Sequence, residues 1–378
     1  MLLSAALSRS FLITVGSAFV KPHRPPSFST RLFSSINGIN LQSSIPRHER
    51  FISLLVKCGC PGSTVTAPLI PVTHDDPNLE DLHPLLIPIV RTKDTVPKYI
   101  CALLSPHNKY STSSDPPTLP IVETYPHSPG LKLLSLNSEH LLRRIAATAD
   151  INSDSEAVDL YNDDLGSGTT LPPNLTSLDC TYSPSDVAGL GYGLDKYLLL
   201  RVGPFPDVYE KLAVLHSEET TRLISAEAAN AKFPGWGSSY RFYAGLLAQG
   251  EGREMEARDA AVVCFRMPIW TVGQDVGDFG KVGKWVGVVG KNKEDDDSNV
   301  MANIDGFYER LKQKEKEELT HDNNDGKTER DGTLERASYL LDKTAMVGQD
   351  WAGVREELAS LYDEAGGLDD LARFIRRE

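Results

Sequence analysis

Residues 232–247, KFPGWGSSYRFYAGLL, place a turn-forming segment directly before an apolar helical pattern. Gly235 and Gly237 give the backbone freedom, and Pro234 stiffens the approach. This arrangement predicts a joint in which Trp236 fills the seam between one helix pair and the next. The alternative is a loop that anchors a ligand or partner. Lys232 and Arg241 are the only charged residues of the stretch, which does not favour a catalytic loop.

The stretch opens a helical hairpin. We expect a first helix that begins after Ser238 or Ser239 as N-cap and a second within residues 253–267. Large side chains on the first helix would face small ones on the second, as in one tetratricopeptide-type hairpin (Tyr240, Tyr243 and Leu247 against Ala257, Ala260, Ala261 and Cys264). A second copy at a period of about 34 residues is absent from the sequence, so a superhelical array is not predicted.

Helical patterns also flank this hairpin. Residues 205–217 place Val208, Leu212 and Leu215 on one predicted face, and residues 218–233 form a second helix. The glycine-rich residues 268–290 lack the spacing of a phosphate-binding loop, so we expect a connection whose Trp270 and Trp285 pack on the hairpin. Two or three closing helices are expected, within residues 333–348, 350–367 and 368–377.

The sequence pattern of residues 45–150 predicts a mixed α/β unit instead of helices alone. A short helix should end at Gly59, and five apolar runs bounded by Pro, Asp or Asn predict strands (65–72, 83–90, 98–105, 119–125 and 130–136). The prolines in these runs predict that several strands lie at sheet edges. A helix capped by Asn137 or Ser138 then closes the unit.

The chain is therefore predicted to be an α+β protein, an N-terminal mixed α/β unit followed by an all-helical domain with a TPR-like hairpin. The expected order is a presequence at 1–44, the α/β domain at 45–150, a flexible linker at 151–190, the helical domain at 191–290, an acidic charged insertion at 291–332 and C-terminal helices at 333–378 that pack on the helical domain.

The N-terminus has the composition of a targeting segment. Residues 1–48 contain no Asp or Glu, although the whole chain has a formal net charge of −13. A short apolar region followed by a basic, Ser-rich region is typical of a bipartite plastid presequence, with Ala18–Phe19 at the junction. A mitochondrial presequence is the alternative, because Arg31 stands just ahead of Phe33.

Composition narrows the class of function. The acidic balance and the lack of a basic cluster do not favour nucleic-acid binding. Five scattered cysteines do not form a disulfide pattern, and no run approaches the roughly 20 apolar residues of a membrane span. No nucleophile elbow, zinc-protease motif or dinucleotide fingerprint occurs, and the spacing of Cys58, Cys60, His74 and His83 matches no standard zinc site. We therefore expect that the protein is not an enzyme, has no catalytic residues and binds no cofactor or metal.

Several blocks carry a family resemblance. GLKLLSLNSEHLLRRI at 130–145, the stretch from Phe233 to Gly273 and WAGVREELASLYDEAGGLDDLARFI at 351–375 are the most telling. In these blocks the chain resembles the family of the plant chloroplast protein IN CHLOROPLAST ATPASE BIOGENESIS and its algal relatives. The resemblance covers most of residues 45–285 and 333–378. It departs at the linker and the acidic insertion, which are longer in this chain.

The resemblance implies a stromal assembly factor for the chloroplast ATP synthase, a chaperone-like protein that helps the γ subunit join F1. Helix-in-groove contacts through aromatic anchors would suit this role, and the acidic charge would suit a basic client. The candidate contact residues, each of which could instead fill the core, are Trp236, Tyr240, Phe242, Trp270 and Trp285. The alternatives are an organelle enzyme with a small-molecule substrate between its domains and a generic helical protein-binding scaffold, located in the plastid or in the mitochondrial matrix.

Overall fold

The computed structural model describes residues 48–73, 76–104, 119–163, 181–287, 328–347 and 350–377, all of which belong to one unit, Arg31–Glu378. The predicted presequence and most of the predicted acidic insertion lie outside the described residues. The α+β class is confirmed, because an antiparallel sheet in the first half is followed by a helical region. The predicted domain boundaries stay predictions.

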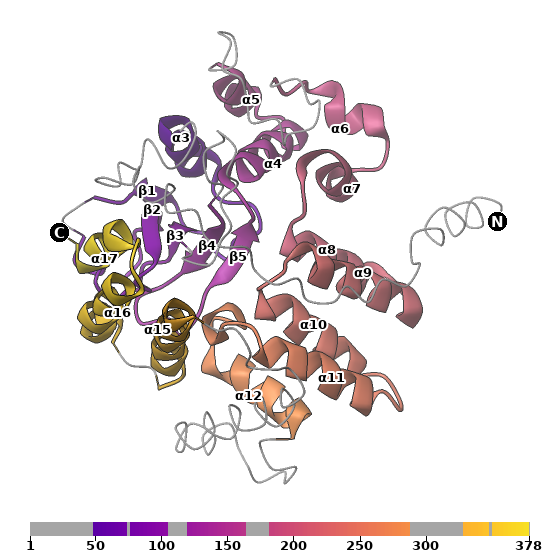
Figure 1. The fold of residues 1–378 in the computed structure, drawn as a ribbon. Helices are drawn as coiled ribbons and strands as arrows, with labels where there is room; N and C mark the ends of the chain where they lie inside the picture. Colours follow the sequence, from indigo (N-terminus) through magenta and orange to yellow (C-terminus); the bar gives the residue numbers. More distant parts are fainter. Residues whose placement is uncertain are drawn as a thin grey trace. The chain divides into compact units, whose positions relative to one another are not determined.

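A five-stranded antiparallel sheet is formed by the five predicted apolar runs (Figure 1). The strands are paired in sequence order: β1 (Leu69–Pro71), β2 (Leu86–Thr92), β3 (Tyr99–Leu103), β4 (Ile121–Thr124) and β5 (Lys132–Ser135). Central strands β3 and β4 are buried throughout, as continuous apolar runs predict.

Two prolines test the prediction about sheet edges. Pro71 ends the edge strand β1, as predicted, whereas Pro88 lies in β2, between two other strands. The prediction is wrong for Pro88, because β2 is not an edge strand. The pairing register shifts between Pro88 and Val90, and this irregularity accommodates a residue without an amide hydrogen.

Three helices, which contact one another, accompany the sheet. Helix α3 (His48–Cys58) contacts β1 and β2 and ends before Gly59, whose φ is 75°, as predicted. Helix α4 (Ser138–Ile151) contacts β5, and the Asn137 side chain caps it by accepting a hydrogen bond from the His140 amide at 2.7 Å. Helix α5 (Ser155–Asn162) follows, inside the range predicted as a linker.

The chain then enters the helical region. Helices α6 (Ser185–Leu190) and α7 (Leu194–Tyr197) and the π-helix η2 (Leu198–Val202) lead to two successive hairpins. The first joins α8 (Pro206–Leu215) to α9 (Glu219–Lys232), and the second joins α10 (Gly237–Leu247) to α11 (Glu254–Phe265). All four small residues predicted to line α11 are buried, so the hairpin prediction is confirmed, and its TPR-like character stays a prediction.

Three details of the helical prediction are wrong. Helix α10 begins at Gly237, and neither predicted serine caps it. Residues 276–286 form helix α12 (Val276–Val286), which follows the short 3₁₀ helix η3 (Ile269–Thr271), where only a connection was expected. Leu215 is 67% exposed, although its spacing from Val208 predicts a core position, because α8 ends there.

The closing helices are α15 (Glu329–Val347), α16 (Trp351–Ala365) and α17 (Asp369–Arg376). Asp342 of α15 accepts a hydrogen bond from the Ile269 amide at 2.7 Å, which fixes α15 to η3. Arg355 of α16 donates to the Leu82 carbonyl at 2.8 Å in the α/β region. The C-terminal helices therefore contact both the helical region and the loops of the sheet.

Among the described helices, none combines the length and the apolar character that a membrane crossing requires.

Candidate partner-binding surface

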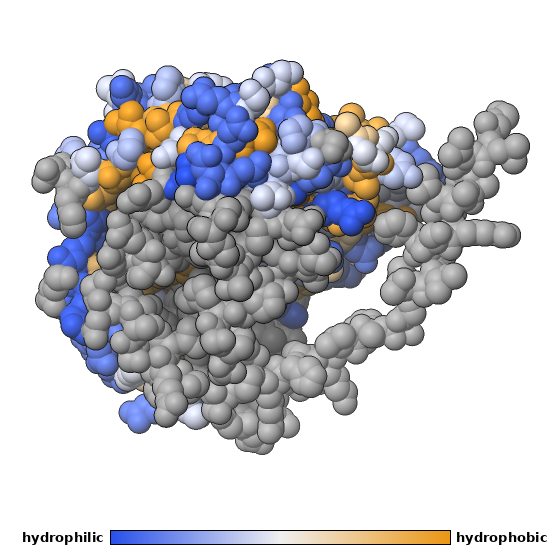
Figure 2. Space-filling view, turned by 90° about the horizontal axis from the view of Figure 1, so that it is seen from above, coloured by the Kyte–Doolittle hydropathy of each residue, from blue (hydrophilic) through white to orange (hydrophobic). Residues whose placement is uncertain are grey.

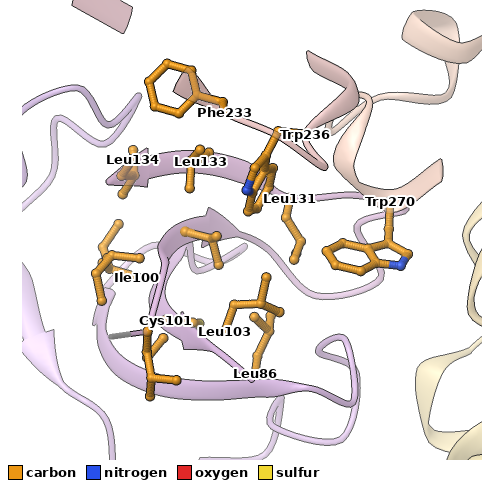
Figure 3. Packing of buried hydrophobic residues seen from close by; sticks show 14 of the residues in the cluster. Leu86, Ile100, Cys101, Leu103, Leu131, Leu133, Leu134, Phe233, Trp236 and Trp270 are labelled. Carbon is orange, nitrogen blue, oxygen red and sulfur yellow. The ribbon is translucent and has the colours of Figure 1, made fainter. Parts of the chain in front are cut away.

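Two of the five candidate aromatic residues, Trp236 and Trp270, lie together in the interior. Their rings meet edge to face with centroids 6.3 Å apart, and only 6% and 8% of the two residues is exposed. Figure 3 shows Trp236 directed toward the chain that carries Leu131 and Leu133, with Trp270 close to Leu131. Trp236 therefore fills a joint, but the joint lies between the helical region and strand β5 rather than only between helix pairs.

Backbone contacts hold this joint closed. The Gly237 amide donates to the Thr271 hydroxyl at 2.9 Å, and the Leu131 amide donates to the Trp270 carbonyl at 2.8 Å. A side chain at Gly130 would bring a Cβ atom within 1.9 Å of the Gly273 carbonyl oxygen. The segment after η3 therefore approaches the start of β5 so closely that only glycine fits there.

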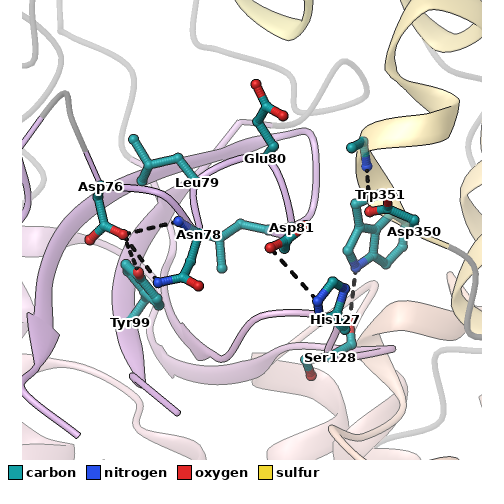
Figure 4. Close-up of polar contacts among 12 residues, drawn as sticks. Asp76, Asn78, Leu79, Glu80, Asp81, Tyr99, His127, Ser128, Asp350 and Trp351 are labelled. Atoms are coloured by element: carbon teal, nitrogen blue, oxygen red, sulfur yellow. Dashed lines mark hydrogen bonds and ion pairs between the residues drawn. The ribbon is translucent and has the colours of Figure 1, made fainter. Parts of the chain in front are cut away.

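The contact continues into the C-terminal helices. His83 lies between Trp270 and Trp351, with ring centroids 4.9 Å and 4.7 Å apart. We call Trp236, Trp270, His83 and Trp351 the aromatic seam, because these rings join the helical region, a loop before β2 and the first turn of α16. Trp351 extends it by donating its indole N–H to the Ser128 carbonyl at 3.0 Å, as Figure 4 shows.

The imidazole of the aromatic seam is held in its neutral form. His83 is 1% exposed, and its Nδ1 atom accepts a hydrogen bond from the Leu85 amide at 3.3 Å. Burial, reinforced by the charge of nearby Arg355, lowers the pKa of His83 to about 3. His83 therefore acts as an aromatic core residue at neutral pH.

The other three candidates, Tyr240, Phe242 and Trp285, are half-buried and lie on α10 and α12. Tyr240 and Trp285 pack partly on the core, and the Trp285 ring lies 3.3 Å from the position a Cβ atom would take at Gly245. Among the described residues, Phe242 does not belong to the apolar side chains that pack against the core. Phe242 is thus the candidate whose ring is best placed to contact another molecule.

An ion pair orients the helices that carry these rings. Arg241 of α10 donates to the Val272 carbonyl and to Asp278 of α12, both at 2.8 Å. Because its guanidinium spans two segments, it fixes α10 relative to the first turn of α12. The half-buried aromatic residues are therefore carried by helices whose relative positions are set by hydrogen bonds.

Exposed apolar side chains extend beyond the predicted candidates. On the face in Figure 2, orange apolar residues alternate with blue hydrophilic ones. Five of the strongly exposed apolar residues lie between the end of α6 and the first turns of α9 (Tyr192, Leu200, Val214, Leu215 and Ile224). Of these five, only Leu215 has a position that helical spacing assigned to the core. Their exposure depends on which neighbours cover each segment, which local sequence patterns do not show.

The titratable groups of the described residues include two buried thiols and one cluster of possible metal ligands. Cys60 and Cys264 are buried, and burial raises the pKa of each thiol to about 12, which keeps both in the unreactive protonated form. Among the described residues, Asp81, His127 and Asp350 place ligand atoms within 4.8 Å of one another, as a metal ion would need (Figure 4). His127 is 62% exposed, however, and lies 3.7 Å from Asp81 as a surface ion-pair partner.

The fold and this surface define an α+β protein in which aromatic residues join a small antiparallel sheet to successive helical hairpins. Residues 206–287 match the PAB middle domain, and residues 306–378 match the PAB C-terminal domain. The matched regions include Trp236, Tyr240, Phe242, Trp270 and Trp285, together with the described helices α15 to α17.

Among known proteins, the chain is similar to the protein IN CHLOROPLAST ATPASE BIOGENESIS, chloroplastic, of Arabidopsis thaliana. The two chains are 27% identical over 301 residues, which cover 78% of this chain and 79% of the relative. The family resemblance predicted from the sequence is thereby confirmed. No solved structure matches the chain.

Proposed function

We propose that this protein is a plastid stromal assembly factor for the chloroplast ATP synthase, which helps the γ subunit join F1. The observation that carries the proposal is the similarity to the Arabidopsis protein, whose name states chloroplast ATPase biogenesis and which aligns over 78% of this chain. The matches to both PAB domains support it over the helical regions. We also propose that the protein binds its client without catalysing a reaction, and the word biogenesis in the relative's name supports this role.

The proposed client-binding surface is the half-buried aromatic group of Tyr240, Phe242 and Trp285. Their rings are borne by two helices whose geometry Arg241 fixes through its bonds to Val272 and Asp278. Aromatic residues on rigid helices contribute a large contact area with little loss of side-chain freedom. Trp236 and Trp270 would support this surface indirectly, through packing in the core, since both are buried at the joint.

Charge supports the kind of client. The chain has a formal net charge of −13, which accelerates its association with a basic protein surface. High salt screens this attraction and should slow the association. This protein must release its client into the larger assembly. Its affinity for the client should therefore be lower than the affinity of the client for its final partners.

The proposal is tested with the purified chain and the isolated γ, α and β subunits of chloroplast ATP synthase, by calorimetric titration of each subunit. We expect binding to γ and at least tenfold weaker binding in Phe242→Ala, because truncation removes a half-buried ring that does not pack against the described core. Tyr339→Ala, a truncation of a 40% exposed tyrosine on α15, is the matched control and should bind as the unaltered protein does. Absence of binding to every subunit would contradict the proposal.

A further inference from the structure

A pocket opens between the last turn of α4 and helix α6, away from the aromatic group described above. Its volume is 360 Å³. The apolar lining comes from Ile151 of α4 and from Pro184, Val187 and Ala188 at the start and along the length of α6, and Asp150 contributes a carboxylate. Figure 1 shows α4 and α6 as neighbours. The volume is sufficient to admit one large apolar side chain.

The walls of this pocket are held in place by a buried arginine. Arg143 of α4 donates to Asp186 of α6 at 2.8 Å and to the Thr181 carbonyl at 2.7 Å. Its guanidinium also lies over the ring of Tyr182, 4.8 Å from the centroid. Because the arginine is 6% exposed in its side chain, these contacts fix α6 against α4 before any partner arrives.

The pocket carboxylate is oriented but is not neutralised. The Tyr182 hydroxyl donates to Asp150 at 2.6 Å, which fixes the carboxylate at the pocket wall. Among the described residues, no ion pair to Asp150 is formed, whereas nearby Asp154 pairs with Lys57 at 3.7 Å. Asp150 therefore presents a negative charge that a cation could neutralise.

The surroundings strengthen this negative potential. The last turn of α4 contains no basic residue, so the partial negative charge of the helix C-terminus adds to that of Asp150. Residues 150–163 contain Asp150, Asp154, Glu156, Asp159 and Asp163 and no Lys or Arg. Lys57 and Arg50 of α3 pair with part of this group from the side of α5.

The rim offers apolar surface beside the charge. Ile151 is 50% exposed and Tyr192 is 63% exposed. Gly191 and Gly193 flank Tyr192 with φ of 71° and 80°, and a Cβ atom at either glycine would meet nothing within 4 Å. There is thus open space at the rim for an occupant. The Lys196 ammonium lies over the Tyr192 ring, 5.1 Å from its centroid, so an occupant would contact the remainder of this 63% exposed residue.

We propose that this α4–α6 pocket docks a basic segment of a protein partner. One apolar side chain of that segment enters between Ile151 and Val187, and an adjacent Lys or Arg pairs with Asp150. The combination of an apolar cavity, a fixed unneutralised carboxylate and an exposed aromatic rim matches this chemistry. The residues that line the pocket lie outside the ranges that match the PAB domains, whereas Tyr240, Phe242 and Trp285 of the proposed client surface lie inside them.

The probe is a phage-displayed library of random dodecapeptides selected on the purified full chain, followed by fluorescence anisotropy of the enriched peptides. We expect a consensus with an apolar residue next to Lys or Arg. Ala188→Arg should weaken binding at least tenfold, because the new side chain fills the pocket and repels a cation. Asp150→Asn, which keeps an oxygen for the Tyr182 hydroxyl, should weaken binding about two- to fivefold and reduce its salt dependence.

Ala248→Arg introduces the same side chain at an exposed position after α10 and is the matched control, with unchanged binding expected. Thermal unfolding of all three variants checks that they fold. The proposal would be overturned if the selection enriched no peptide, which would occur if another part of the chain filled the pocket. Peptides without a basic residue, or binding that Ala188→Arg leaves unchanged, would overturn it as well. Phe242→Ala separates the two proposals, because it should impair client binding and leave peptide binding intact.

Discussion

The replacement of Trp236 by alanine tests whether this residue supports the fold or contacts a partner directly. Only 6% of Trp236 is exposed, so the truncation removes nearly all of the ring's packing. An aromatic side chain removes about 150–250 Å² from water, and at about 25 cal/mol per Å² this corresponds to roughly 4–6 kcal/mol. Truncations of buried Phe or Trp cost about 3–5 kcal/mol.

We therefore expect Trp236→Ala to lower the free energy of unfolding by about 3–5 kcal/mol. The edge-to-face contact with Trp270 accounts for about 0.5–1.5 kcal/mol of this loss. Urea unfolding followed by far-ultraviolet circular dichroism measures the change, because the variant also removes a fluorophore. Trp236→Phe keeps an aromatic ring in the joint and should lose less.

Phe242→Ala is the comparison, since its half-buried ring does not belong to the apolar side chains that pack on the described core. It should change the free energy of unfolding by less than about 1 kcal/mol. If Trp236→Ala lost less than about 1 kcal/mol while client binding disappeared, the assignment of Trp236 to the joint would be refuted.

Three further substitutions probe other parts of the structure. Gly130→Ala should cost several kcal/mol, roughly 3 or more, because its Cβ atom would lie 1.9 Å from a backbone carbonyl, and thermal unfolding measures the loss. Asp207→Ala leaves the guanidinium of Arg144, which it binds at 2.7 and 2.5 Å, buried without its anion, so urea unfolding should show a loss of about 3–5 kcal/mol. His83→Phe should flatten the dependence of stability on pH, because neutral His83 in the folded state resists the protonation that the unfolded chain undergoes below about pH 6.5.

The sign of the pH effect follows from the lowered pKa. Above about pH 6.5 His83 is neutral in both states and its titration has no effect on stability. As the pH falls from there toward the folded-state pKa of about 3, the unfolded state binds the additional proton, and stability declines by about 1.4 kcal/mol per pH unit. His216→Gln, at an exposed histidine, is the control and should keep the slope of the unaltered protein. An identical slope in His83→Phe would contradict the neutral, buried state of this residue.

Local sequence patterns were sufficient for most secondary structure. The five strands follow from apolar runs bounded by Pro, Asp and Asn, and Asn137 and Gly59 mark helix ends as their side-chain chemistry predicts. Helix α12 was missed because Gly277, Gly280 and Gly283 lower helix propensity. Gly280 and Gly283 are buried, and tertiary packing against α11 supplies the stabilisation that propensity does not.

The aromatic seam could not be predicted because its members come from distant parts of the chain. Trp236 and Trp270 stand within one region of sequence, but His83 and Trp351 join them only after the sheet and the C-terminal helices have packed. Neither spacing nor composition links residue 83 to residue 351. The pocket beside Asp150 depends in the same way on Arg143, which fixes α6 against α4.

The proposed role of this protein in assembly of the chloroplast ATP synthase is tested most directly by affinity purification of the tagged protein from isolated plastids with quantitative mass spectrometry. We expect the γ subunit and its F1 neighbours to be enriched over other stromal proteins. Phe242→Ala should reduce this enrichment, and Tyr339→Ala should preserve it. Recovery of the tagged protein from plastids without any ATP synthase subunit would contradict the claim.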